Sequence, residues 1–83
     1  MTNFINNTAE NRFEYHVEGH VSSATYRQKG ADLYIDFVFS PPALRGTGAA
    51  STLMQHIKFY ADQKSLNIVP ICSYAVHWIN KNT

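Results

Sequence analysis

The sequence has little of several residue types, and each shortage excludes a class of protein. Among 83 residues there is one cysteine, Cys72, so an internal disulfide cannot form and a disulfide-stapled secreted domain is excluded. No apolar run is long enough to cross a membrane. The polar start MTNFINNTAENR lacks the charged and apolar regions of a signal peptide. We therefore expect a cytoplasmic protein without a membrane partner.

An excess of charge of one sign is also absent. Seven Lys and Arg stand against six Asp and Glu, which leaves a net charge of +1. This balance argues against a nucleic-acid partner. His16 and His20 are four residues apart, but Gly19 lies between them as a turn signal, so the helical spacing of metal ligands does not apply. With a single cysteine besides, we predict no metal site.

What the chain does contain is enough apolar residues for one small core. Hydrophobic residues make up 45% and aromatic residues 13%, which is typical of a folded domain. We predict a single domain over residues 1–83, in which residues 1–11 form a polar lead-in. A core this small fits either a monomer or a weak homodimer.

Alternation of apolar and polar residues predicts three strands joined by short turns, at residues 12–18, 21–28 and 33–40. Three consecutive strands of this kind form an antiparallel meander. The predicted buried face of the third strand consists of Leu33, Ile35, Phe37 and Phe39.

The second half of the chain changes period. Apolar residues at steps of three and four predict a helix over residues 48–64. A short apolar run predicts a strand at 68–72, and a second helix follows from Tyr74 to about Asn80, capped by Ser73. The fold class is therefore α+β, a sandwich of one sheet and two helices in the order β-β-β-α-β-α.

A glycine-containing turn connects the third strand to the first helix. After Pro41-Pro42 the chain reads Ala-Leu-Arg-Gly-Thr-Gly-Ala-Ala up to Ala50. The unpaired N–H groups and the dipole of a helix N-terminus favour an anion such as a phosphate, glycine lets the backbone approach it, and Arg45 can add a charge-assisted contact. The spacing matches neither the P-loop nor the dinucleotide fingerprint. A plain tight turn that binds nothing is the alternative.

The pattern Arg-x-x-Gly-x-Ala, formed by Arg45, Gly48 and Ala50 at a strand-to-helix turn, resembles the acetyl-CoA signature of the GNAT N-acetyltransferase superfamily. The longer run Pro-Pro-Ala-Leu-Arg-Gly-Thr-Gly-Ala-Ala, followed by Val-Pro-Ile-Cys-Ser-Tyr, resembles its very small members, sometimes called minimal acetyltransferases. The resemblance covers roughly residues 12–82, and the order of predicted elements agrees with it.

The resemblance implies a site for acetyl-CoA or CoA. Backbone N–H groups of residues 45–50 would hold the diphosphate, and the third strand would pair with the pantetheine arm. The implied cofactor-binding residues are Val38, Ser40, Arg45, Gly46, Thr47, Gly48, Ala49 and Ala50. A gap between the strands at 33–40 and 68–72 would receive the thioester, and Cys72 lies where that gap should open.

The function implied by the resemblance is acetyl-CoA-dependent N-acetyltransfer to an unidentified amine, either a small molecule or a protein. Two departures weaken the catalytic part. Phe37-Val38-Phe39-Ser40 stands where this branch usually reads His-Thr-Glu-Val, so a carboxylate is missing, and Ile79-Asn80 stands near the place of a tyrosine acid in larger enzymes. A CoA-binding module with little or no catalytic activity is therefore the alternative, and a small interaction domain that binds no CoA is the third hypothesis.

The candidate catalytic residues are Cys72, Tyr74 and His77. Cys72 would act as a nucleophile or lie beside the pantetheine thiol, and a packed, inert thiol is its alternative reading. Tyr74 and His77 are three apart on the last predicted helix and either could serve as acid or base. A packed tyrosine and an exposed surface histidine are the alternative.

Overall fold

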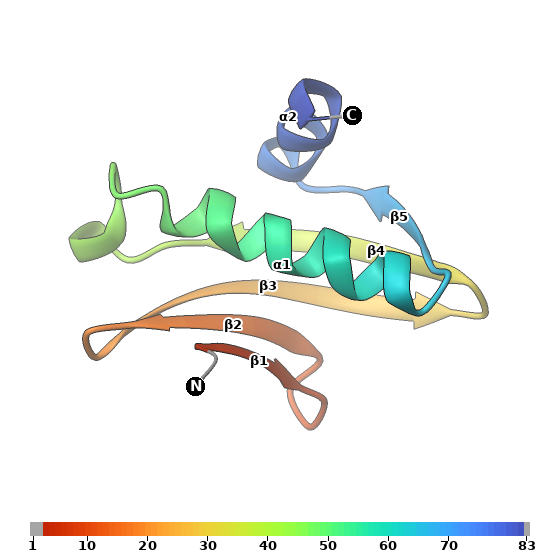
Figure 1. Ribbon diagram of the computed structural model, residues 1–83, viewed down its shortest axis with the longest axis horizontal. Coiled ribbons are helices and arrows are strands. Elements are labelled where there is room, and N and C mark those ends of the chain that lie inside the picture. The colour runs from red at the N-terminus through yellow and green to blue at the C-terminus, as the bar shows by residue number, and fades with distance from the viewer. Residues whose placement is uncertain (1–2, 83) are drawn as a thin grey trace.

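The computed structural model describes residues 3–82, so residues 1, 2 and 83 of the expected domain lie outside the described part. It is an α+β fold with one five-stranded sheet and two helices (Figure 1). In chain order the elements are β1 (Phe4–Asn7), β2 (Arg12–Val17), β3 (His20–Lys29), β4 (Asp32–Phe39), the 3-10 turn η1 (Pro42–Leu44), α1 (Ala49–Gln63), β5 (Asn67–Pro70) and α2 (Ser73–Asn82).

The sheet has one strand more than the sequence predicts. Its order is β1-β2-β3-β4-β5, with antiparallel pairs up to β4 and a parallel pair between β4 and β5. The prediction of a three-stranded meander is therefore wrong by one strand, because the expected lead-in at residues 1–11 contains β1. The ring of Phe4 anchors this strand, stacking on Phe13 at 5.6 Å and on His56 at 5.0 Å between centroids. Four residues that read FINN are too few and too polar to reveal an alternation.

A β-bulge interrupts β4. Opposite β3, Tyr26 pairs with Ile35 and Thr25 pairs with Phe37, so Asp36 is an additional residue without a partner in this register. An additional residue in one strand moves every following side chain to the other face of the sheet.

The bulge overturns the predicted buried face of this strand. Ile35 is buried, but beyond the bulge it is Val38 that packs against the core, while Phe37 and Phe39 are exposed by 56% and 42%. The assignment of Phe37 and Phe39 to the buried face is therefore wrong. Alternation alone cannot reveal a bulge, because the apolar period continues through it.

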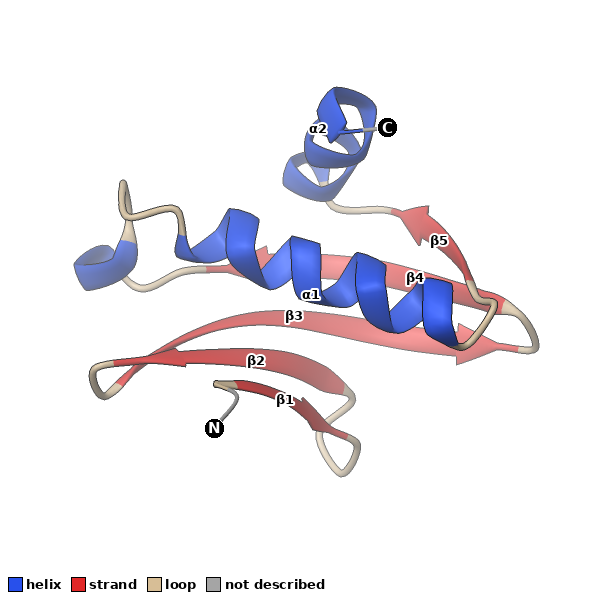
Figure 2. Ribbon diagram, viewed as in Figure 1, coloured by secondary structure: helices blue, strands red, loops and turns tan. Residues whose placement is uncertain are grey.

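One layer of side chains between the sheet and both helices forms the core. Figure 2 shows α1 lying along one face of the sheet. The buried cluster consists of Phe13, Ala24, Tyr26, Leu33, Ile35, Leu53, Met54, Ile57, Ala61, Ala75 and Trp78. The indole N–H of Trp78 donates to the hydroxyl of Ser51 at 2.9 Å. This bond joins the middle of α2 to the first turn of α1.

The opposite face of the sheet carries a buried carboxylate. Glu14 accepts hydrogen bonds from Arg12 at 2.6 Å, His16 at 2.9 Å and Asn7 at 3.0 Å. These bonds, that from Arg12 above all, lower the pKa of Glu14 from 4.5 to about 2. These hydrogen bonds connect the end of β1 to β2.

Within residues 3–82, neither helix is long and apolar enough to span a bilayer.

Candidate functional site

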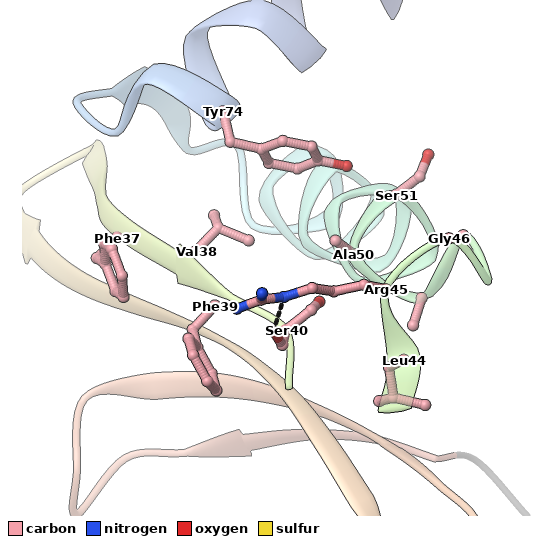
Figure 3. A pocket seen from close by; sticks show the side chains of 12 residues that line it. Phe37, Val38, Phe39, Ser40, Leu44, Arg45, Gly46, Ala50, Ser51 and Tyr74 are labelled. Carbon is pink, nitrogen blue, oxygen red and sulfur yellow. Dashed lines mark hydrogen bonds between the residues drawn. The ribbon is translucent and has the colours of Figure 1, made fainter. Parts of the chain in front are cut away.

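A pocket of about 450 Å³ lies where β4 ends and α1 begins. It is lined by Phe37, Val38, Phe39, Ser40, Leu44, Arg45, Gly46, Gly48, Ala49, Ala50, Ser51 and Tyr74 (Figure 3). The lining includes every residue predicted to bind the cofactor except Thr47. It also brings Tyr74, from the start of α2, to the same place.

The two glycines of the turn have backbone conformations that other residues rarely adopt. Gly46 has a φ of 80°, and Gly48, the N-cap of α1, has a φ of 84°. A side chain at a φ in this left-handed region is strained. Leu44 is buried just before the turn and fixes its base. The glycines therefore set the path by which the chain enters the helix.

Three of the six N–H groups predicted to face an anion are bonded inside the turn. Arg45 donates to the carbonyl of Pro42 at 3.2 Å, and Thr47 donates to the carbonyl of Leu44 at 3.2 Å. Ala49 donates to the hydroxyl of Thr47 at 3.3 Å. Every second N–H group of the turn is thus satisfied within the turn itself.

The other three predicted N–H groups, at Gly46, Gly48 and Ala50, are joined by a fourth at Ser51, the next residue of α1. None of them has a hydrogen-bond acceptor among the described residues. Ser51 was not among the predicted residues, although its position in the first helical turn, where N–H groups are unpaired, is the signal that identifies it. The first turn reads Ala-Ala-Ser-Thr, a sequence without a carboxylate. Such a group of donors at the positive end of a helix suits a phosphate or diphosphate.

The side chain of Arg45 reaches across the mouth of the pocket to the end of β4. Its Nε donates to the carbonyl of Ser40 at 3.1 Å (Figure 3). This places a positive charge at the end of β4, on the border of the pocket. The hydroxyl of Ser40 is bonded to that of Ser22 at 2.7 Å. Arg45 thus occupies one of the two lone pairs of the Ser40 carbonyl, and an arm that pairs with β4 there would use the other.

The parallel pairing of β5 with β4 stops in mid-strand. Its last pair is Ile35 with Pro70. The carbonyl of Ile35 then accepts from the N–H groups of both Ile71, at 3.0 Å, and Cys72, at 3.2 Å. After this point β5 turns away into α2, and a gap opens beside the second half of β4.

Cys72 is half-buried at the closed end of this gap. Burial by itself raises the pKa of the thiol, but the backbone N–H groups of Val38, Ala75 and Tyr74 approach the sulfur and together lower the pKa below its ordinary value. Cys72, the last residue before α2, thus lies close to the N–H of Val38 in β4.

The other two catalytic candidates lie in different surroundings. Tyr74 lines the pocket, and burial raises the pKa of its phenol. It therefore carries its proton at neutral pH and can donate it. His77 is exposed and lies outside the pocket lining. Within residues 3–82, no three His, Cys, Asp or Glu residues gather in a way that could hold a metal ion.

Comparison with known proteins gives a consistent result. The family described as GCN5-related N-acetyl-transferase matches residues 12–83. Among solved structures, the chain is similar to a GCN5-like protein from Staphylococcus aureus, named as a candidate N-acetyltransferase, whose structure was determined in solution by NMR. The two share 25% identity and superpose with a TM-score of 0.67, covering 98% of this chain and 82% of that one. No curated protein matches closely enough to count as a relative.

Proposed function

The chain belongs to the family of GCN5-related N-acetyltransferases, and from this membership we propose that it binds acetyl-CoA between β4 and α1 and transfers the acetyl group to an amine. The observation that carries the proposal is the set of unpaired N–H groups at Gly46, Gly48, Ala50 and Ser51, together with the charge of Arg45. These groups fit a diphosphate in number, sign and place.

The gap beside the second half of β4 fits the other end of the ligand. When bound, acetyl-CoA supplies an acetyl group activated as a thioester. The N–H of Val38 faces this gap and can donate to a carbonyl oxygen there, which stabilises the negative charge that develops during attack. Tyr74 holds its proton and can give it to a leaving sulfur.

The reaction requires that the amine nitrogen form a bond to the acetyl carbon while the carbon–sulfur bond breaks and its electron pair stays on sulfur. The nitrogen must lose a proton, and the sulfur must gain one. Among the twelve lining residues there is neither a carboxylate nor a histidine to take the proton from nitrogen. Deprotonation of the amine therefore falls to water, and the residues of the pocket contribute mainly by orienting the reactants.

The lack of a base in the lining favours a second candidate function, a CoA-binding module with little or no transfer. Both functions share the same binding site. They differ only in whether the bound thioester is consumed.

Calorimetric titration with acetyl-CoA and with CoA tests the shared part. We expect micromolar dissociation constants, and no binding of either ligand at millimolar concentration would overturn both candidates. Release of the CoA thiol in the presence of a panel of primary amines, followed with a thiol-reactive dye, then separates them. Acetylated amine in step with thiol release supports the transferase, whereas binding without release supports the binding module.

A further inference from the structure

A second pocket, of about 630 Å³, lies between β1 and the C-terminal half of α1. It is lined by Phe4, Gln55, His56, Phe59, Tyr60, Gln63 and Lys64, and it shares no residue with the pocket between β4 and α1. Within residues 3–82, α2 packs near β4 and β5, so no second helix covers the β1 side of α1 (Figure 1). The volume suits a small molecule. We call this space the α1–β1 pocket.

The helical wall of the α1–β1 pocket combines aromatic and polar side chains. Residues four apart on a helix lie one above the other. Two such rows border the pocket: Gln55, Phe59 and Gln63 form one, and His56, Tyr60 and Lys64 form the other. The ring of Phe59 is exposed by 62%. It therefore offers an open aromatic surface on which a flat ring can stack.

Tyr60 presents an unused hydroxyl proton to this pocket. Its oxygen accepts a hydrogen bond from the amide nitrogen of Asn6 at 3.4 Å, and the oxygen of Asn6 accepts one from the hydroxyl of Tyr26 at 2.7 Å. Nothing among the described residues accepts the proton of Tyr60. The chain of bonds thus fixes the Tyr60 oxygen as an acceptor and leaves its O–H free to donate to a ligand.

The charge at the α1–β1 pocket is positive. The ammonium of Lys64 lies 5.9 Å from the centre of the Tyr60 ring, and no carboxylate of the described residues pairs with it. The lining contains neither Asp nor Glu. A cationic ligand would be repelled by Lys64, whereas a carboxylate would be attracted to it.

We propose that the α1–β1 pocket binds a flat aromatic carboxylate. The ring of this ligand stacks on Phe59, and its carboxylate accepts hydrogen bonds from the ammonium of Lys64 and the hydroxyl of Tyr60. Ring stacking and a charge-assisted hydrogen bond together select this class over aliphatic acids and over neutral aromatic molecules. The inference does not depend on the proposed function, because the two pockets have no residue in common.

Titration with 2-naphthylacetate and with its neutral amide, 2-naphthylacetamide, tests the inference. Both are added to the full chain labelled with nitrogen-15, and the backbone N–H signals are followed by NMR. We expect naphthylacetate to bind with a dissociation constant of about 1 mM and to move the signals of residues 55–64, while the amide binds about tenfold more weakly. The signals of residues 46–51, at the proposed diphosphate site, should not move.

Three variants test the individual contacts. Lys64→Met should weaken binding of naphthylacetate about tenfold and leave binding of the amide unchanged. Phe59→Ser should weaken binding of both ligands by the same factor, because both use the ring. Lys58→Met is the matched control: it removes the same charge from α1 at a residue outside the α1–β1 pocket, where Lys58 bonds to Asp62 at 3.3 Å. It should change neither affinity.

Four outcomes would overturn the proposal. These are no movement of the signals of residues 55–64 at about 10 mM naphthylacetate, equal affinities for the acid and the amide, and equal effects of Lys58→Met and Lys64→Met. The fourth is displacement of naphthylacetate by CoA, because it would place the ligand in the pocket between β4 and α1 instead.

Discussion

Placing a negative charge in the turn at Gly48 should abolish the proposed diphosphate site without closing the space. A Cβ at Gly48 would meet no atom within 4 Å, so Gly48→Glu is not excluded by contact. If the new carboxylate lies about 5 Å from two phosphate charges, at an effective dielectric constant of about 40, each pair costs about 1.7 kcal/mol. The two pairs together cost about 3 kcal/mol, which corresponds to roughly a hundredfold loss of CoA affinity.

Two controls separate this charge effect from backbone strain. Gly48→Gln has the same shape without the charge, and we expect it to lose only a small part of the affinity. Both Gly48 variants should unfold with about 1–2 kcal/mol less free energy, because φ is 84° at this position. Gly30→Gln carries a similar strain, with a φ of 59°, in the turn between β3 and β4, and should leave CoA affinity unchanged.

The assay is calorimetric titration of each variant with CoA at low salt and again at high salt. Because salt screens charges, the difference in CoA affinity between Gly48→Glu and Gly48→Gln should be smaller at high salt. Chemical denaturation of the same samples gives the free energies of unfolding. Equal affinities for Gly48→Glu and Gly48→Gln would refute the argument, because the site would then not be sensitive to charge.

Three further predictions concern other parts of the molecule. Hydrogen bonds lower the pKa of Glu14 from 4.5 to about 2, so Glu14 stabilises the fold above pH 4.5 and loses this effect as the pH falls towards 2. Glu14→Gln should lower the free energy of unfolding by about 1–3 kcal/mol at pH 7 and make it depend less on pH below 4.5. If urea unfolding gives the variant and the unmodified protein the same change in free energy between pH 5 and pH 3, the hydrogen-bond network does not have this role. Cys72 should be alkylated by iodoacetamide at a rate that falls about tenfold when CoA is present at ten times its dissociation constant, and mass spectrometry that finds the same rate with and without CoA would place the thiol away from the bound ligand. Phe39→Glu restores a carboxylate on the exposed side of β4 and should raise amine acetylation by at least about tenfold if a missing base limits the reaction; unchanged turnover would show that the base is not the limitation.

Local features of the candidate site were predictable because their causes lie within a few residues. The helical period after residue 48 and the glycines at 46 and 48 point to an anion-binding turn, and that turn lines the pocket. The same spacing cannot tell which N–H groups are already bonded. The hydrogen bond from the Ala49 N–H to the Thr47 hydroxyl, for example, requires a particular side-chain rotamer and turn geometry, which residue types alone do not specify.

Features that depend on register between distant segments were not predictable. In β4 the apolar alternation continues through Phe39. Its pairing with β3 nevertheless leaves Asp36 as an additional residue, and Phe37 becomes exposed. Likewise β1 is stabilised by the stacking of Phe4 on His56, fifty-two residues later in the numbering of the chain. In both cases the deciding contact is made by residues that a local pattern does not connect.

By itself the sequence determines the order of the elements from β2 onwards, the apolar stripe of α1, the glycine turn and the resemblance to the acetyltransferase family. Periodicity and short motifs are properties of neighbouring residues, whereas β1 showed no such pattern. Only the tertiary structure decides that Cys72 meets the N–H of Val38, that β5 parts from β4 at Ile35, and that Asp36 joins Phe37 on the uncovered face. These juxtapositions follow from how strands pair and where pairing stops, which is a balance of packing over the whole sheet.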